Sequence, residues 1–171
     1  MKHSFILFLL LVSCTLCTAQ VRYDGKLETG YLKFLNHNIT FDAGENFKGY
    51  NLEKKQNGID VNTTHGISFG NNKAFAGLGV GYANFEGVQG MAAYSEIEFL
   101  TNRSKISPLL GMKIGYNHIW NQYEGGSGTA MMDLGVGIHY KVADRMGLFL
   151  KTGLYFAQQS TLIPIRLGVR F

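Results

Sequence analysis

The chain has 171 residues, enough for one domain, with 46% apolar and only 16% charged residues, against a usual charged share of about 25%. Its 22 glycines come with only 2 prolines, a composition that excludes both a disordered and a collagen-like chain. The formal net charge of +4 is spread along the sequence rather than clustered, which argues against a nucleic-acid partner.

The start of the chain has the pattern of a targeting segment. Lys2 supplies a short basic start, and the apolar run over 5–12 is too short to span a bilayer as a helix. Cys17 and Ala19 then place small residues at the −3 and −1 positions of a cleavage site. The sequence therefore predicts a signal peptide over 1–19.

Both cysteines of the chain lie inside this leader. A mature domain over 20–171 would have no thiol and no disulfide, although it enters an oxidising compartment. The stretch Leu11-Val12-Ser13-Cys14 also resembles a lipobox. Lipidation at Cys14 therefore stays open as an alternative to cleavage after Ala19.

The mature chain alternates apolar and polar residues with the two-residue period of a β-strand. The last segment is the clearest case, because every odd position over 163–171 is apolar and the even positions hold proline, glycine and arginine. The first strand is poorly defined, because its alternation is irregular. In chain order, strands are expected within 28–41 and over 59–69, 76–83, 91–99, 108–121, 130–141, 146–156 and 163–171.

The connections between these segments differ in length. The stretches 70–73, 102–105 and 142–145 are short and polar, as tight turns require. The stretch 44–58 is the one substantial loop. We therefore predict an all-β fold, an eight-stranded antiparallel up-and-down transmembrane β-barrel, with the short turns at one end.

Volume decides which face of each strand points outward. The interior of an eight-stranded barrel is only just wide enough to be filled by side chains, so the many large apolar residues do not fit inside it. The opposite face carries glycines and a limited set of charges, and these do fit. The apolar face is therefore expected to meet lipid, since a lysine or arginine there would cost about 2–4 kcal/mol at the bilayer midplane.

The charges on the glycine-bearing face have nearly balanced signs. Buried charges need partners, so we interpret this set as an internal network of ion pairs and hydrogen bonds rather than as a metal or catalytic carboxylate site. The predicted network consists of Asp60, Glu96, Glu98, Lys113, Asp133, Lys141, Lys151, Arg166 and Arg170.

Aromatic residues gather near the strand ends on the apolar face, as in the girdles that border a membrane. The alternative is that aromatic residues simply suit β-strands. The residues concerned are Tyr82, Phe99, Tyr116, Trp120, Tyr140, Phe156 and Phe171.

Together these features resemble the small bacterial outer-membrane β-barrel proteins, the eight-stranded group that includes the OmpA and OmpX barrels. The resemblance is carried by the leader ending Thr18-Ala19-Gln20, the Gly-x-Gly strands at 77–81 and 135–137, and the alternating C-terminal strand. It implies that Phe171 is a signal read by the barrel-assembly machinery during insertion. It also implies an outer-membrane location, outer-membrane lipid as a partner, and a monomer.

The histidines are the candidates for catalysis. His139 shares a face with Asp133, but six strand residues at about 3.3 Å each place them too far apart for a hydrogen bond. His65 lies on the apolar face, with Ser68 and Ser95 as candidate nucleophiles nearby. A structural or interfacial histidine is the simpler interpretation.

The sequence therefore favours a non-enzymatic outer-membrane protein with no cofactor and no metal. Its lumen would be plugged by the charged network, and its role would be structural or a surface interaction through 44–58. Two alternatives remain open: a lipid-modifying enzyme that uses His65 or His139, and a secreted, soluble, lipocalin-like barrel that binds an apolar ligand.

Overall fold

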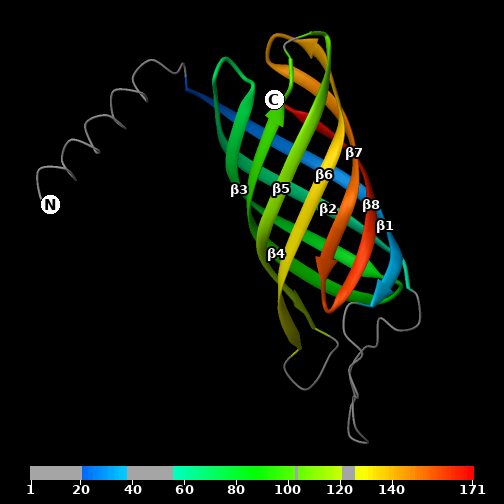
Figure 1. Cartoon of the computed structure of the whole chain (residues 1–171). Helices are drawn as coiled ribbons and strands as arrows, with labels where there is room; N and C mark the ends of the chain where they lie inside the picture. Colours follow the sequence, from blue (N-terminus) through cyan, green and yellow to red (C-terminus); the bar gives the residue numbers. More distant parts are fainter. Residues whose placement is uncertain (1–20, 38–55, 103, 121–125) are drawn as a thin grey trace, which may run out of the picture.

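The computed structural model describes residues 21–37, 56–102, 104–120 and 126–171. These residues form a closed barrel in which each strand pairs antiparallel with the next and β8 pairs with β1 (Figure 1). The strands are β1 (Arg22–His37), β2 (Gly58–Phe69), β3 (Ala74–Phe85), β4 (Val88–Leu100), β5 (Ile106–Ile119), β6 (Ser127–Ala143), β7 (Met146–Ala157) and β8 (Ser160–Arg170). The predicted fold class is confirmed.

Closure has a local cause at the first and last strands. Phe171 exchanges two backbone hydrogen bonds with Gly25, at 2.7 and 2.9 Å, and the ladder between β1 and β8 continues from Lys26 to His37. No sheet edge is left open along this seam, which a barrel surrounded by hydrocarbon requires.

The expected position of the first strand is wrong at its start. β1 begins at Arg22, whereas the sequence was interpreted as placing the strand within 28–41. The inward-pointing Asp24 and Lys26 alternate with the outward-pointing Tyr23 and Leu27, so the missing residues obey the same two-residue rule as the other strands.

The connections define two ends of the barrel. The turn end carries the turns at 70–73 and 144–145, the residues 101–102 and 104–105 between β4 and β5, and Phe171, and the loop end is the opposite end of the barrel. Two tight turns, at 86–87 and 158–159, lie at the loop end. Both residues of the first have positive φ, 51° at Glu86 and 105° at Gly87, as in the turns that match the twist of a hairpin.

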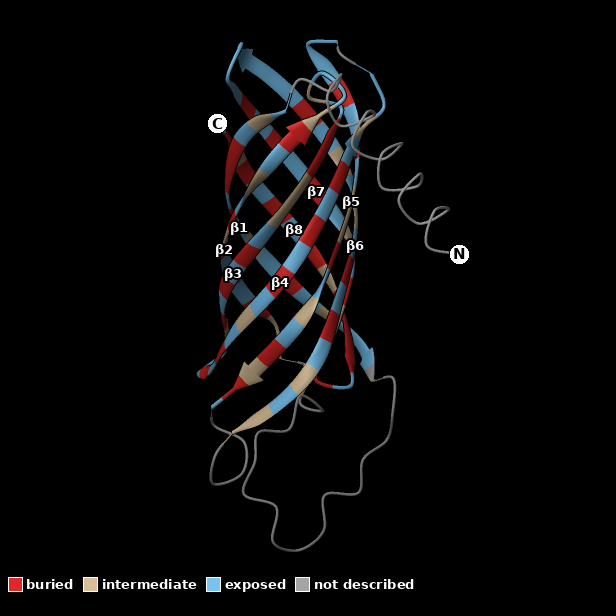
Figure 2. Cartoon of the chain, turned by 90° about the vertical axis from the view of Figure 1, so that its left-hand side faces the viewer, coloured by how far each residue is buried: buried red, intermediate tan, exposed pale blue. Residues whose placement is uncertain are grey.

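Burial alternates residue by residue along the strands (Figure 2). In β7, for example, Leu148 and Leu150 are exposed, whereas Phe149 and Lys151 are buried. Within the described residues, no helix is long and apolar enough to cross a membrane. The core of this fold is the inside of the barrel.

Candidate functional site

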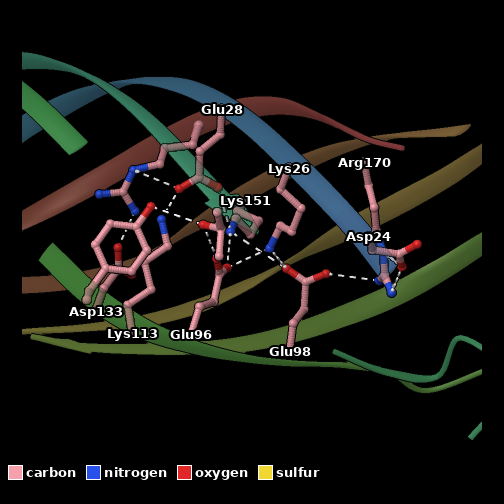
Figure 3. A network of polar contacts seen from close by, with 12 residues as sticks. Asp24, Lys26, Glu28, Glu96, Glu98, Lys113, Asp133, Lys151 and Arg170 are labelled. Atoms are coloured by element: carbon pink, nitrogen blue, oxygen red, sulfur yellow. Dashed lines mark hydrogen bonds and ion pairs between the residues drawn. The ribbon is translucent and has the colours of Figure 1, made fainter. Parts of the chain in front are cut away.

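Charged side chains fill the middle of the lumen (Figure 3). Nearly equal numbers of acids and bases lie there, which limits the free energy lost when each charge leaves water. Among the described residues, the buried acids are Asp24, Glu28, Asp60, Glu96, Glu98 and Asp133, and the buried bases are Lys26, Lys113, Lys151, Arg166 and Arg170.

The centre of this network is built around two lysines. The Lys26 Nζ donates to Glu96 Oε1 at 2.6 Å and also to Glu98. The Lys151 Nζ lies 2.7 Å from Glu28 Oε2 and 3.2 Å from Glu96 Oε1. Because these five residues come from β1, β4 and β7, the ion pairs tie together strands that are not neighbours in the barrel.

Toward the loop end, the network continues through Arg166. Its Nε donates to Asp60 Oδ2 at 2.8 Å, its Nη1 donates to Asp133, and Glu28 lies 4.0 Å away. Glu28 in turn accepts from Lys113. One guanidinium on β8 thus joins carboxylates from β1, β2 and β6.

Toward the turn end, Arg170 plays the same part. Its Nη2 lies 2.8 Å from Asp24 Oδ2, and its Nη1 lies 3.4 Å from Glu98 Oε1. Ser68 donates to Asp24, and Arg22 holds the other oxygen of this carboxylate at 2.6 Å. Asp24 therefore has partners on both of its oxygens.

Each buried base also faces an aromatic ring of the lumen. Lys26 lies 5.1 and 5.2 Å from the ring centres of Phe75 and Phe149, and Lys151 lies 4.9 Å from that of Phe149. A cation over the face of an aromatic ring is attracted by the π electrons of the ring, so these contacts stabilise the buried bases in addition to their carboxylate partners. The remaining pairs are Lys113 with Tyr94, Arg166 with Tyr155, and Arg170 with Phe75.

Little free space remains inside this region. A cavity of about 10 Å³ lies beside Asp60, and another lies between Glu96 and Lys151. Each has room for about one water molecule. The Asp60 Oδ1 has no hydrogen-bond partner within the described residues, so the first cavity is a suitable place for a bridging water.

An apolar cluster fills the lumen at the loop end. Leu32, Phe85, Ile119 and Leu162 are at most 2% exposed and pack together there. This layer departs from the polar, glycine-lined interior expected from the sequence. The lumen is therefore layered, with apolar side chains next to the loop end and charges in the middle.

Eight of the nine predicted network residues lie inside the barrel, and Lys141 does not. Its side chain is 48% exposed and pairs with Asp144 at 2.7 Å in the turn that follows β6. Lys141 still pairs with Gly147, but it lies at the rim of the barrel, just before the pairing with β7 shifts, where its side chain reaches Asp144 instead of the buried charges. Including Lys141 in the network was wrong.

Three network residues were missed because the first strand was misplaced. Asp24, Lys26 and Glu28 are all at most 2% exposed. Their spacing of two, with apolar or small residues between them, is the sequence signal that would have identified them.

The outer surface is apolar. Large exposed side chains include Leu78 at 71%, together with Leu150 and Leu167 on β7 and β8. Of the charged residues in the described strands, Lys33 and Lys141 are exposed, and both lie near strand ends. Six of the seven residues of the expected aromatic girdle are exposed, and Phe156 is half-buried.

His65 lies on this outer surface, and the hydrogen-bond partners of its ring within the described residues are two hydroxyl groups. Its Nδ1 lies 2.6 Å from the Tyr23 hydroxyl, and its Nε2 lies 3.2 Å from the Thr63 hydroxyl. Ser68 points into the lumen, and Ser95 lies on β4, with Leu78 of β3 between it and His65 in the register. The serines therefore do not meet His65, whose ring is held by a phenol and a threonine.

The other candidate groups are also separated. His139 is buried near the turn end, and Asp133, on the same strand, is bonded to Arg166 instead. His118 faces the ring of Trp120 edge-on, with ring centres 6.1 Å apart. Within the described ranges, no three histidine, cysteine or acidic side chains gather as metal ligands.

Comparison with solved structures identifies barrels of the same architecture. Neisserial surface protein A aligns over 88% of this chain and 97% of its own, with 11% identity and a TM-score of 0.67. The N-terminal β-barrel domain of Pseudomonas aeruginosa OprF aligns over 89% of this chain and 98% of its own, with 13% identity and a TM-score of 0.52. The resemblance to eight-stranded outer-membrane barrels is thus confirmed as one of fold.

No protein-family model matches the chain, and no curated protein matches it.

Proposed function

We propose that this chain is an integral outer-membrane protein that acts as a structural or surface-interaction element rather than as an enzyme. The observation that carries the proposal is the separation of side chains across the barrel wall. Large apolar residues cover the outside, and the buried charges lie in the lumen. The fold shared with Neisserial surface protein A and the OprF barrel supports the same assignment.

The separation is the opposite of what a soluble ligand-binding barrel needs. Such a barrel would place charges outside and leave an apolar cavity inside. Here Lys26, Glu96 and Glu98 occupy the middle of the lumen, and Leu78 and Leu150 lie outside. If water surrounded the barrel, it would meet an unusually large apolar surface.

The location is tested by fractionating cells that express the full chain with its leader. We expect the protein in the outer-membrane fraction, released by detergent but not by high salt or alkaline carbonate, because its outer surface is held by acyl chains. An outer-membrane porin and a periplasmic protein serve as the two markers. Recovery with the periplasmic marker, without detergent, would contradict the proposal and favour the soluble barrel.

The lumen is proposed to be closed to ions. The apolar cluster around Leu32 and Phe85 and the charged network next to it fill this part of the lumen, and the two cavities among their described residues each measure about 10 Å³. An ion crossing this region would have to displace ion-paired side chains such as Arg166.

Purified protein inserted in a planar bilayer should therefore show no steady single-channel current. A general porin measured in the same chamber provides the positive control, and the orientation of insertion is varied by adding protein from either side. A large, stable conductance that appears with insertion would show that the lumen is open.

The predicted leader over 1–19, and with it the alternative of lipidation at Cys14, lies outside the described residues. We keep cleavage after Ala19 as part of the proposal, because an outer-membrane protein must be exported. Most of 44–58, the stretch expected to mediate a surface interaction, also lies outside the described ranges. Phe171 is 51% exposed at the end of β8, a position from which its ring is available to the assembly machinery.

A further inference from the structure

A pocket opens at the turn end of the barrel, next to the part of the charged network that holds Arg170. It has a volume of about 170 Å³, room for about ten water molecules. This is far larger than the cavities of about 10 Å³ in the middle of the lumen. Its walls include Asn71 and Asn72, Asn102 and Ser104, and Asp144 and Arg145 from the three turns at this end, so the pocket faces whatever lies beyond it.

Basic side chains surround the pocket in excess of acidic ones. Arg22, Arg170, Lys141 and Arg145 line it, whereas Asp144 is the only acid among the described residues of its lining. Arg22 and Arg170 share the carboxylate of Asp24 on the lumen side of the pocket, and Lys141 is paired with Asp144. Within the described part of the chain, Arg145 makes no hydrogen bond and no ion pair, which leaves its five donors for a ligand.

The wall also holds a polar group without a partner. His139 is 8% exposed and lines the pocket, yet its ring makes no hydrogen bond within the described residues. A Cβ at Gly147 would overlap the Nε2 edge of this ring, so the glycine makes room for the imidazole. A buried imidazole that faces a cavity rather than a protein acceptor is available to hydrogen-bond a molecule inside it.

Neutral polar side chains complete the lining. Asn102 and the buried Ser107 lie on one side, and Asn71 and Asn72 lie on another. The Ser107 hydroxyl is 2.7 Å from Asn102 Oδ1, so the amide nitrogen of Asn102 is the end left to face other groups. Cationic and amide donors around one small volume are the chemistry that recognises an oxyanion.

We propose that this pocket binds a single oxyanion, a phosphate or carboxylate group, on a molecule reached from the turn end of the barrel. Arg145 and His139 are the residues that contact it, and Arg22 and Arg170 supply positive potential from the lumen side of the pocket. The site is independent of the proposed membrane location, because it lies at the mouth of the lumen and not on the outer surface. The shared chemistry has two sources, a lipid headgroup at the rim or a soluble anion.

Nuclear magnetic resonance of the full mature chain in non-ionic maltoside micelles tests the site. Inorganic phosphate is titrated at constant ionic strength against sodium chloride, with the His139 ring and the amides of Ser107 and Gly147 as probes. We expect saturable shifts at these probes and none at the Trp120 indole, which lies at the loop end. Absence of saturable shifts at the pocket throughout the titration would overturn the proposal.

Two variants with equal loss of charge separate a site from general attraction. Arg145→Gln should weaken phosphate binding by about tenfold, the value of one charge-assisted hydrogen bond. Lys73→Gln removes a charge from an exposed turn at the same end but outside the pocket, and should leave the affinity within about twofold. Equal weakening by both variants would reduce the effect to net charge and overturn the site.

Measurements in bilayer nanodiscs without free phosphate distinguish the two sources of the oxyanion. Shifts of the pocket probes on adding phosphatidylglycerol to phosphatidylcholine would support the proposal with a lipid headgroup as the ligand. Shifts that need added phosphate in both lipids would support it with a soluble anion.

Discussion

Replacing Lys26 with methionine should lower the free energy of unfolding by about 3–5 kcal/mol, the cost of removing one partner from a buried ion pair. The ammonium lies between Glu96 and Glu98 and is 1% exposed, so its loss leaves two buried carboxylates with less positive charge near them. Methionine keeps an unbranched chain against the rings of Phe75 and Phe149, which confines the change to the charge. Denaturant titration in phospholipid vesicles, followed by the gel shift between folded and unfolded barrel, measures the loss.

Two further variants identify the cause of this loss. Lys73→Met removes a lysine from an exposed turn and should change the same free energy by no more than about 0.5 kcal/mol. Lys26→Met combined with Glu98→Gln should be more stable than the sum of the two single losses predicts, because one unpaired carboxylate is then removed. Strict additivity would mean that Lys26 and Glu98 do not interact and that the network stabilises the barrel in some other way.

The direction of each side chain could be predicted from the sequence because alternation is a local property. Once volume had assigned the apolar face to the outside, Glu96, Lys113 and Arg166 had to point inward, and they do. The same reasoning does not predict which of the inward-pointing charges pair with one another. The pairing of Arg166 with Asp60, 106 positions away, depends on how the strands stagger around the closed barrel, which a single sequence does not reveal.

Alternation also fails where a strand departs from a regular ladder. Lys141 has the parity of the lumen, but the shift in pairing next to it and the end of the barrel wall leave it beside Asp144. The pocket at the turn end could not be predicted either, because its lining is assembled from three turns and from the turn-end residues of the first and last strands, Arg22 and Arg170. The sequence suggests His139 only as a candidate catalytic histidine, whereas the structure places it in the wall of a cavity.

The same layering explains how a barrel with no thiol in its described residues is held together. Apolar side chains such as Phe85 and Leu162 close one end of the lumen, and charges joined to carboxylates and rings fill the middle. Ion pairs between distant strands, such as Arg166 with Asp133, fix the stagger as well as the contents of the lumen. In the proposed membrane location no such specificity is needed outside the wall, because acyl chains accept any apolar side chain.

That difference between the two sides makes the outer face sensitive to charge in a way that depends on depth. Leu150→Arg should destabilise the barrel by about 2–4 kcal/mol in phospholipid vesicles. Leu150 is 53% exposed, lies near the middle of β7, and is flanked by Ile138 and Leu167 on the neighbouring strands. An arginine there has no carboxylate beside it and must reach the headgroups along apolar neighbours.

Met146→Arg is the matched control, because Met146 is 44% exposed at the start of the same strand, next to the turn at 144–145. A guanidinium at that height lies near the headgroups, so we expect a loss of about 0–1 kcal/mol. If the barrel were surrounded by water, both arginines would be tolerated equally, since neither would meet hydrocarbon. A small and equal effect at the two positions would therefore contradict a lipid-facing wall, whereas a loss confined to Leu150 measures the depth of hydrocarbon around the barrel.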